Sequence, residues 1–183
     1  MKITVAYIWI LLWIIVFLIG FRAENQELLW NQGFHILYMQ YYRLVSALLL
    51  HTNVFHLLAN AVAVYWVGDF LYGQVGTIAM FLFSVIAGAV SNAVFSWVYP
   101  NSCSFGGSPA VFALMGLIVV LQFMRKDVPI FQWQNTYGVW ILSYGILSNI
   151  PLFSKNISTL VLHTVAFAVG MLFAAMGIKM GIL

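Results

Sequence analysis

Residues 106–116 read Gly-Gly-Ser-Pro-Ala-Val-Phe-Ala-Leu-Met-Gly and join a polar loop to an apolar run that ends near Met124. The two leading glycines can adopt backbone angles that other residues avoid, so they allow a tight turn directly before Ser108. Ser108 suits the N-cap of the following helix, and Pro109 suits its first position, where a missing N–H has no cost. The stretch predicts a helix headed by a serine hydroxyl, which is either a nucleophile or only a cap.

The composition is that of a membrane protein. Of the 183 residues, 64% are hydrophobic and 6% are charged, and the mean hydropathy is +1.01, whereas soluble domains carry roughly a quarter charged residues. The net charge of +3 comes from scattered residues without a basic run, so we expect no nucleic-acid partner. The single cysteine, Cys103, cannot form an intramolecular disulfide and is interpreted as a bystander.

Six apolar stretches are interpreted as membrane-spanning helices, which need about 20 residues each. The first lacks the small-residue cleavage site of a signal peptide, so we expect it to be retained. Residues 21–42 mix polar and aromatic side chains, a composition typical of a segment that lies in the membrane interface. The predicted spans cover about residues 3–20, 54–72, 77–99, 108–124, 133–150 and 159–177 of a single domain, residues 1–183.

These spans predict an all-α membrane protein, a bundle of six transmembrane helices with an interfacial first loop. With six spans both termini lie on one side, which holds four Lys or Arg residues against three on the other, so the positive-inside rule favours a cytoplasmic N-terminus. The second, fourth and sixth spans then all begin on the outer side. The aromatic stripe of the fifth span, which includes Tyr144, is interpreted as interface belt and packing.

Polar side chains gather at the outer ends of these three parallel spans. His51 and His56 lie near the start of the second span, and Asn60 follows His56 by one helical turn. Ser108 opens the fourth span and His163 lies early in the sixth. Because ionisable and polar groups within membrane spans are costly and mark function, we expect Ser108, His56, Asn60 and His163 to converge, with His51 making a structural hydrogen bond.

Small residues predict how the fourth and sixth spans meet. Phe112 and Gly116 follow Ser108 at four-residue spacing, as Gly170 follows Ala166 on the sixth span. Small residues at this spacing let membrane helices pack backbone to backbone. The fourth span has 17 residues, about 25 Å, which is short for a bilayer core of about 30 Å. We therefore expect this helix to begin below the membrane surface, in a dip that admits water.

The pair of Ser108 and His163 suits nucleophilic catalysis. Serine is a weak nucleophile until a base takes its proton, and neutral histidine is such a base. Acyl transfer also needs hydrogen-bond donors aimed at the developing oxyanion, for which His56, the Asn60 amide and the Ser108 backbone N–H are candidates. No Asp or Glu is placed to orient His163, so the mechanism predicted is a Ser–His dyad.

Simpler interpretations of the same residues stay open. Ser108 alone is a helix cap, and His163 alone is an interhelical hydrogen-bonding residue. His51, His56 and His163 are a conceivable zinc set, but no carboxylate or cysteine joins them, so we expect no metal and no cofactor. His35, in the first loop, is interpreted as incidental.

Three motifs resemble those of the rhomboid intramembrane serine proteases. The pattern of His51, His56 and Asn60 is similar to the family's His-x4-His-x3-Asn. Gly106-Gly107-Ser108, followed by Ala113 to Gly116, resembles its Gly-x-Ser motif and the start of that helix.

The third motif and the first loop extend the resemblance over nearly the whole chain. His163 with Gly170 resembles the His-x-x-Gly-x-x-x-Gly of the last core span, and Tyr42-Arg43 resembles the Trp-Arg of the first loop. The chain resembles the minimal six-span bacterial form, which implies the inner membrane as its location.

The resemblance implies a function for each residue. Ser108 would be the nucleophile and His163 the general base, with His56, Asn60 and the Ser108 amide as the oxyanion hole. Substrates would be single-span membrane proteins, cleaved in or near their transmembrane segment, and residues 149–158 would cap the site. Residues expected to support the site are His51, Arg43, Gly106, Gly107, Phe112, Gly116 and Gly170.

Four departures from the family pattern leave an alternative open. Pro109 replaces a glycine, Phe112 a tyrosine, Ala166 a glycine, and Tyr72 a glutamate. These changes admit a catalytically inactive rhomboid-like protein that binds transmembrane helices. The complete set of serine, base and oxyanion donors favours the enzyme. A channel or transporter is disfavoured because the chain has neither buried carboxylates nor an internal repeat.

Overall fold

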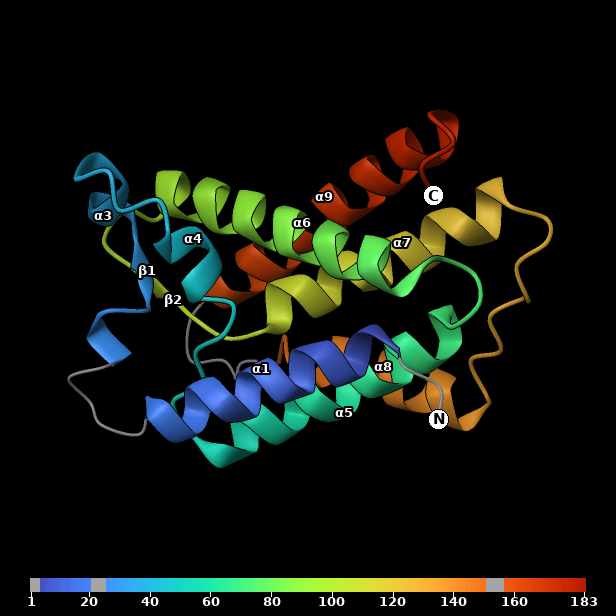
Figure 1. The fold of residues 1–183 in the computed structure, drawn as a ribbon, viewed down its shortest axis with the longest axis horizontal. Coiled ribbons are helices and arrows are strands. Elements are labelled where there is room, and N and C mark those ends of the chain that lie inside the picture. Colours follow the sequence, from blue (N-terminus) through green and yellow to red (C-terminus); the bar gives the residue numbers. More distant parts are fainter. Residues whose placement is uncertain (1–3, 21–25, 151–156) are drawn as a thin grey trace.

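Six helices account for the six apolar stretches in the computed structural model, which describes residues 4–20, 26–150 and 157–183. Each helix begins and ends within three residues of its predicted span, which confirms the all-α fold class. The helices are α1 (Val5–Ile19), α5 (Val54–Leu71), α6 (Thr77–Val98), α7 (Ser108–Met124), α8 (Thr136–Leu147) and α9 (Ile157–Lys179) (Figure 1).

The first loop is a folded cap at one end of the bundle (Figure 1). Its short elements are β1 (Asn31–Gln32), α3 (Gly33–Leu37) and α4 (Arg43–Ser46). β1 pairs antiparallel with β2 (Cys103–Ser104), so the first loop is joined to the loop that precedes α7. The buried Asn31 amide strengthens this junction by donating to Ser96 Oγ at 2.6 Å and to Ser104 Oγ at 3.1 Å. The hydropathy pattern did not predict this small sheet.

Arg43 organises the first loop from within. Its guanidinium is buried and donates through Nη1 to the carbonyl oxygens of Glu27 at 2.6 Å and Trp30 at 3.0 Å. Its Nε donates to Gln40 Oε1 at 2.6 Å. Arg43 therefore satisfies backbone carbonyls of an irregular segment, which would otherwise be costly to bury.

Helix α7 is the central element and packs against α5, α6 and, most extensively, α9. The α7–α9 contact is backbone to backbone. A Cβ added to Gly116 would lie 2.4 Å from the carbonyl oxygen of Phe167, and one added to Gly170 would lie 2.3 Å from that of Ala113. This close contact between α7 and α9 is called the α7–α9 seam. Ala166, four residues before Gly170 on α9, is fully buried, so its methyl group is accommodated. The close approach expected from small-residue spacing is observed.

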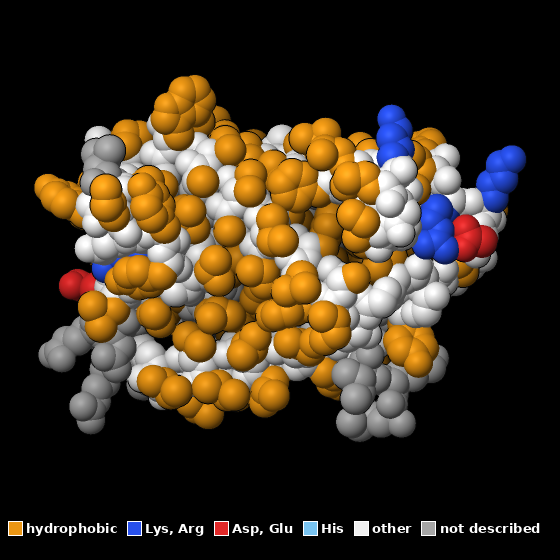
Figure 2. Space-filling view, turned by 45° about the horizontal axis from the view of Figure 1, so that its top comes forward, with side chains coloured by type: hydrophobic (Ala, Val, Ile, Leu, Met, Phe, Trp, Pro, Cys, Tyr) orange, Lys and Arg blue, Asp and Glu red, His pale blue; other side chains and the backbone are white. Residues whose placement is uncertain are grey.

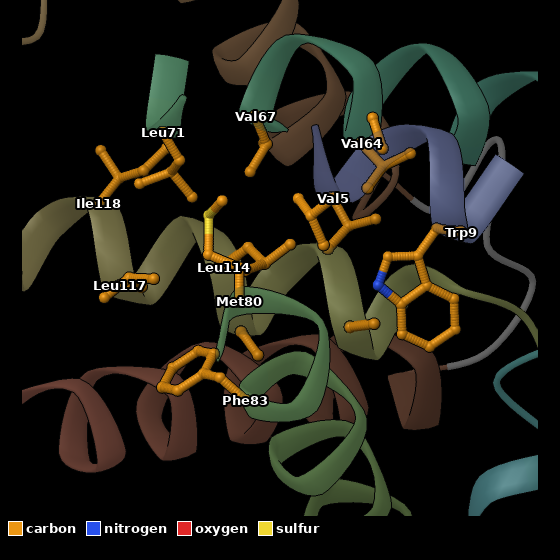
Figure 3. Packing of buried hydrophobic residues seen from close by; sticks show 14 of the residues in the cluster. Val5, Trp9, Val64, Val67, Leu71, Met80, Phe83, Leu114, Leu117 and Ile118 are labelled. Carbon is orange, nitrogen blue, oxygen red and sulfur yellow. The ribbon is translucent and has the colours of Figure 1, made fainter. Parts of the chain in front are cut away.

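The apolar core lies where α1, α5, α6 and α7 meet. Figure 3 shows this packing, with Trp9 of α1 and Leu114 of α7 among its buried members. The polar atoms of the α1 tryptophans are satisfied, because Trp9 Nε1 donates to Ser84 Oγ at 2.9 Å and Trp13 Nε1 to the carbonyl of Leu48 at 3.0 Å. Helix α1 is thus fixed to both α6 and the first loop.

The face shown in Figure 2 is a broad hydrophobic surface with the charged side chains at its two ends. Helices α1, α6, α7 and α8 contain no charged residue. In the described part of the chain, α5, α6 and α9 are long and apolar enough to cross a membrane, while α1, α7 and α8 are apolar but shorter. The count of six spans therefore stays a prediction. The start of α1 and the end of α9 lie at the same end of the bundle, opposite the first loop (Figure 1).

The α7–α9 seam makes Gly170→Ala a test of the fold. The added methyl group would collide with the backbone of Ala113, and overpacking of this kind costs about 1–3 kcal/mol. We expect a lower thermal unfolding temperature in detergent. Gly76→Ala is the matched control, because nothing lies within 4 Å of a Cβ there. Equal unfolding temperatures for the two variants would contradict the close backbone contact between α7 and α9 at Gly170.

Candidate active site

Ser108 and His163 meet where α7 and α9 begin. Ser108 is the first residue of α7, and its Oγ lies 2.9 Å from Nε2 of His163 on α9. Both side chains are buried, with 6% and 3% of their surface exposed. The glycine contacts of the α7–α9 seam hold the two helices close enough for this hydrogen bond. The proximity expected from topology is therefore observed.

The imidazole of His163 is held on two further sides. The Phe112 ring, one turn after Ser108 on α7, stacks on it with ring centroids 4.3 Å apart and planes inclined by 12°. The side-chain oxygen of Asn149 lies 2.8 Å from His163 Nδ1. Asn149 was predicted only as the first residue of the loop that caps the site, because only Asp and Glu were considered as groups that orient the histidine. The hydrogen-bonded chain runs from Ser108 through His163 to Asn149, a third member that the predicted Ser–His dyad did not include.

Asn60 is held in a second polar cluster, on α5. Its Nδ2 lies 2.9 Å from His51 Nε2, and its Oδ1 accepts a hydrogen bond from the Tyr144 hydroxyl at 2.5 Å. His51 precedes α5, as expected, and its Nδ1 lies 3.3 Å from the carbonyl of Leu49. Burial, followed by the nearby His56, lowers the pKa of His51 to about 3. The neutral ring therefore accepts at Nε2 and donates from Nδ1.

Asn60 and Tyr144 both contribute hydrogen-bonding groups to this cluster. The amide of Asn60 has two hydrogens, so one of them stays available to a ligand while the other is given to His51. The interpretation of Tyr144 as interface belt and packing was incomplete, because its hydroxyl is part of the site. Only the helical position of Tyr144 was readable from the sequence, and its direction depends on how α8 packs on α5.

The turn before Ser108 depends on both of its glycines. Gly106 has a φ of +110°, and a Cβ there would lie 2.5 Å from His56 Cε1. A Cβ on Gly107 would lie 2.0 Å from Cζ2 of Trp13. Both positions thus need a residue without a side chain, the first for its backbone angle and for His56, the second for the tryptophan ring.

A cavity of about 730 Å³ opens over these groups. Four of the predicted site residues, namely Ser108, His163, His56 and Asn60, line it, and so does Tyr144. Apolar side chains complete the lining together with polar ones: Thr52, Asn53, Phe55, Ala59, Phe95, Cys103, Ser104, Phe105, Ser148, Ser158, Thr159 and Leu162. A serine, an adjacent base and N–H donors around one cavity are the parts that acyl transfer requires.

The remaining predicted residues lie outside this constellation. Arg43 binds first-loop carbonyls, and His35 lies against Phe34 in α3. Gly116 and Gly170 act through helix packing. Among residues 4–20, 26–150 and 157–183, no three His, Cys, Asp or Glu side chains are grouped so as to hold a metal ion. Most of the predicted cap, residues 151–156, falls outside the described residues.

Comparisons with known proteins agree with this architecture. A family model of the rhomboid domain matches residues 38–180, so the chain belongs to the rhomboid family. It is also similar to the rhomboid protease GluP of Bacillus subtilis (strain 168), with 27% identity over 114 residues. That alignment covers 61% of this chain and 20% of the relative. The alignment spans about a fifth of the length of this curated relative. The rhomboid family and the apolar helices together identify the chain as an integral membrane protein.

The Asn60 cluster predicts a stability effect of Asn60→Ala. The substitution leaves the partly buried Tyr144 hydroxyl without its acceptor, a loss that costs about 1–3 kcal/mol, and removes one of the two hydrogen bonds that His51 Nε2 accepts, the other coming from the Gly107 N–H. We expect a marked decrease of the unfolding temperature in detergent. Asn101→Ala, at an exposed position, should change it little. An Asn60→Ala protein as stable as the Asn101→Ala control would contradict the claim that the hydrogen bonds of Asn60 stabilise the fold.

Proposed function

We propose that this protein is an intramembrane serine endopeptidase that cleaves single-span membrane proteins in or near their transmembrane segment. The observation that carries the proposal is the 2.9 Å separation of Ser108 Oγ and His163 Nε2 at the wall of a large cavity, in a chain of the rhomboid family. A serine that only capped its helix would not need a histidine base at this distance.

The chemistry follows from the positions of these atoms. His163 Nε2 takes the Ser108 proton as Oγ attacks the carbonyl carbon of the scissile peptide bond, which gives a tetrahedral intermediate. His163 then gives that proton to the leaving amine, and an acyl group stays on Ser108. A water molecule, deprotonated by the same histidine, hydrolyses the ester and restores the serine hydroxyl.

The oxyanion of the intermediate has three candidate donors. Asn60, whose amide has a second hydrogen besides the one given to His51, and His56 line the cavity together with Ser108. The backbone N–H of Ser108 is the first of α7, where the orphan amides and the helix dipole favour negative charge. Removing one such donor in serine proteases typically slows the reaction by 2 to 3 orders of magnitude.

The surroundings of the site support a membrane-embedded substrate. Rhomboid proteases act on membrane proteins within the bilayer, and here the hydrophobic surface continues up to the end of the bundle that holds the site (Figure 2). By the positive-inside rule this end faces outward, with the N-terminus in the cytoplasm. We place the protein in a bacterial inner membrane on the strength of its resemblance to the minimal bacterial form.

Pro109, which stands where the family pattern has a glycine, is compatible with activity. The proline occupies the first turn of α7, where a backbone N–H has no intrahelical acceptor. The Ser108 amide is unaffected by this substitution.

Fluorophosphonate labelling tests the proposed nucleophile. The wild type in detergent should react with a tagged fluorophosphonate, and Ser108→Ala should abolish the reaction. His163→Ala should slow it by about 2–4 orders of magnitude because the general base is lost. Ser102→Ala, in the preceding loop, is the matched serine control and should label like the wild type. In-gel fluorescence gives the rates, and circular dichroism verifies folding.

Folded wild type that does not label would contradict the proposal. The helix-binding, inactive rhomboid protein would then be the better account. A single-span substrate reconstituted with the protein in liposomes separates the two further, since the binder retains it uncleaved.

Pro109→Gly tests whether the proline limits the serine. We expect its labelling rate to stay within about threefold of the wild type, because Pro109 leaves the Ser108 amide and hydroxyl in place. A glycine variant that gains reactivity by more than tenfold would show that the proline holds the hydroxyl away from the attacking position.

A further inference from the structure

We propose that α8 completes the active site with two positioning residues near its C-terminal end, Asn149 for the base and Tyr144 for the oxyanion donor. The inference rests on the proposed protease function and goes beyond it, because neither residue belongs to the motifs from which that function was read. Neither residue is a catalytic residue, since each is hydrogen-bonded to a group that reacts or binds and not to Ser108 itself.

The orientation of the Asn149 side-chain amide is fixed by its NH2 group. Its Nδ2 donates to the carbonyl of Gly145 at 2.7 Å, one turn back in α8. Its Oδ1 therefore faces His163 Nδ1, at 2.8 Å. An amide oxygen only accepts hydrogen bonds, so this contact requires a hydrogen on Nδ1. The Nε2 atom then keeps its lone pair for the hydroxyl of Ser108.

Selection of this tautomer is what a third residue contributes to a serine-type mechanism. A histidine that carries its hydrogen on Nε2 cannot accept the serine proton, and the wrong tautomer is very costly for catalysis. A neutral amide performs this selection without placing a charge in an apolar bundle, where an ionised carboxylate would carry a large desolvation penalty. The described titratable side chains that share this cavity with His163 are His56, Cys103 and Tyr144, and none of them is a carboxylate.

Tyr144 fixes the oxyanion donor in the same way. Its hydroxyl donates to Asn60 Oδ1, while His51 Nε2 accepts from Asn60 Nδ2. The reversed amide would place its oxygen against His51 Nε2, an acceptor that also receives the Gly107 N–H, so one orientation is strongly preferred. The oxygen of Asn60 is thereby held away from the developing negative charge, and its second amide hydrogen stays free.

Both contacts come from lightly packed α8 and the residue that follows its C-cap. Helix α8 packs on α5, and its buried residues are Gly138 and Ile141. Asn60 lies on α5, whereas His163 lies on α9, which packs on α6 and α7. The C-terminal end of α8 therefore links the helix of the oxyanion donor to the helix of the base, and the two groups are oriented together.

Substitution of Asn149 tests the link to the base. Asn149→Leu keeps the size and removes the acceptor, and we expect kcat for a peptide or single-span substrate to fall about 10- to 100-fold with KM nearly unchanged. Asn149→Asp restores an acceptor and should recover most of kcat. It should also move the acidic limb of the pH–rate profile to higher pH, because a carboxylate stabilises the protonated imidazole.

The control is Asn135→Leu, at the exposed opposite end of α8. It should leave kcat and the pH profile unchanged. A merely structural role of Asn149 would lower the folded fraction in both Asn149 variants without moving the pH profile of Asn149→Asp. Wild-type kcat and an unshifted profile in the Asn149 variants would overturn the inference.

Nitrogen-15 NMR of histidine-labelled protein tests the same link without any activity. The His163 signals, assigned with His163→Ala, should show the hydrogen on Nδ1 in the wild type and a shift towards Nε2 in Asn149→Leu. An identical tautomer in both proteins would overturn the inference. A tautomer change in a protein that does not label with fluorophosphonate would uphold the positioning by Asn149 and reject the protease function.

Tyr144→Phe tests the link to the oxyanion donor. It removes only the hydroxyl, and we expect kcat to fall about 10-fold while KM changes little. Tyr65→Phe, at a partly exposed position of α5, is the matched control and should not alter kcat. Equal kcat values for Tyr144→Phe and the wild type would overturn this half of the inference.

Discussion

The backbone contact between α7 and α9 is the constraint on which the rest of the structure depends. Gly116 and Gly170 allow the two helices to approach until a single methyl group at either position would collide with the opposing backbone. Dispersion and packing drive such contacts within a membrane, since lipid offers no hydrophobic gain for helix association. The seam sets the distance between the starts of both helices, and the hydrogen bond between Ser108 and His163 follows from it.

A second constraint is that polar groups buried in an apolar bundle need partners. Here the partners come in chains: Ser108 to His163 to Asn149, and His51 to Asn60 to Tyr144. Both chains connect residues from different parts of the bundle, so the helices must be in place together before either chain is complete. The tight turn at Gly106 and the folded first loop close the same end of the bundle.

The sequence predicted the fold and much of the candidate site because those features follow from local patterns and from the direction of the spans. Hydropathy marked the helices to within three residues, and the serine and proline at 108 and 109 marked the start of α7. The parallel direction of three spans was enough to bring Ser108, His56, Asn60 and His163 to one cavity.

The contacts that the sequence did not predict depend on where side chains point in the folded protein. Asn149 follows the end of α8, where nothing in the local pattern tells whether its side chain faces water or His163. Tyr144 is one of several aromatic residues at helical spacing, and only the packing of α8 on α5 selects it. The β1–β2 pair joins segments about seventy residues apart, and two-residue strands have no readable periodicity.

An experimental structure of the protein after reaction with a fluorophosphonate would test the central claim most directly. The phosphoryl oxygen of the adduct stands in for the oxyanion of the tetrahedral intermediate. We predict phosphorus bonded to Ser108 Oγ, its oxygen within hydrogen-bonding distance of the Asn60 amide and the Ser108 backbone N–H, and His163 still paired with Asn149. An unmodified Ser108, or an adduct whose oxygen points away from Asn60, would contradict the account.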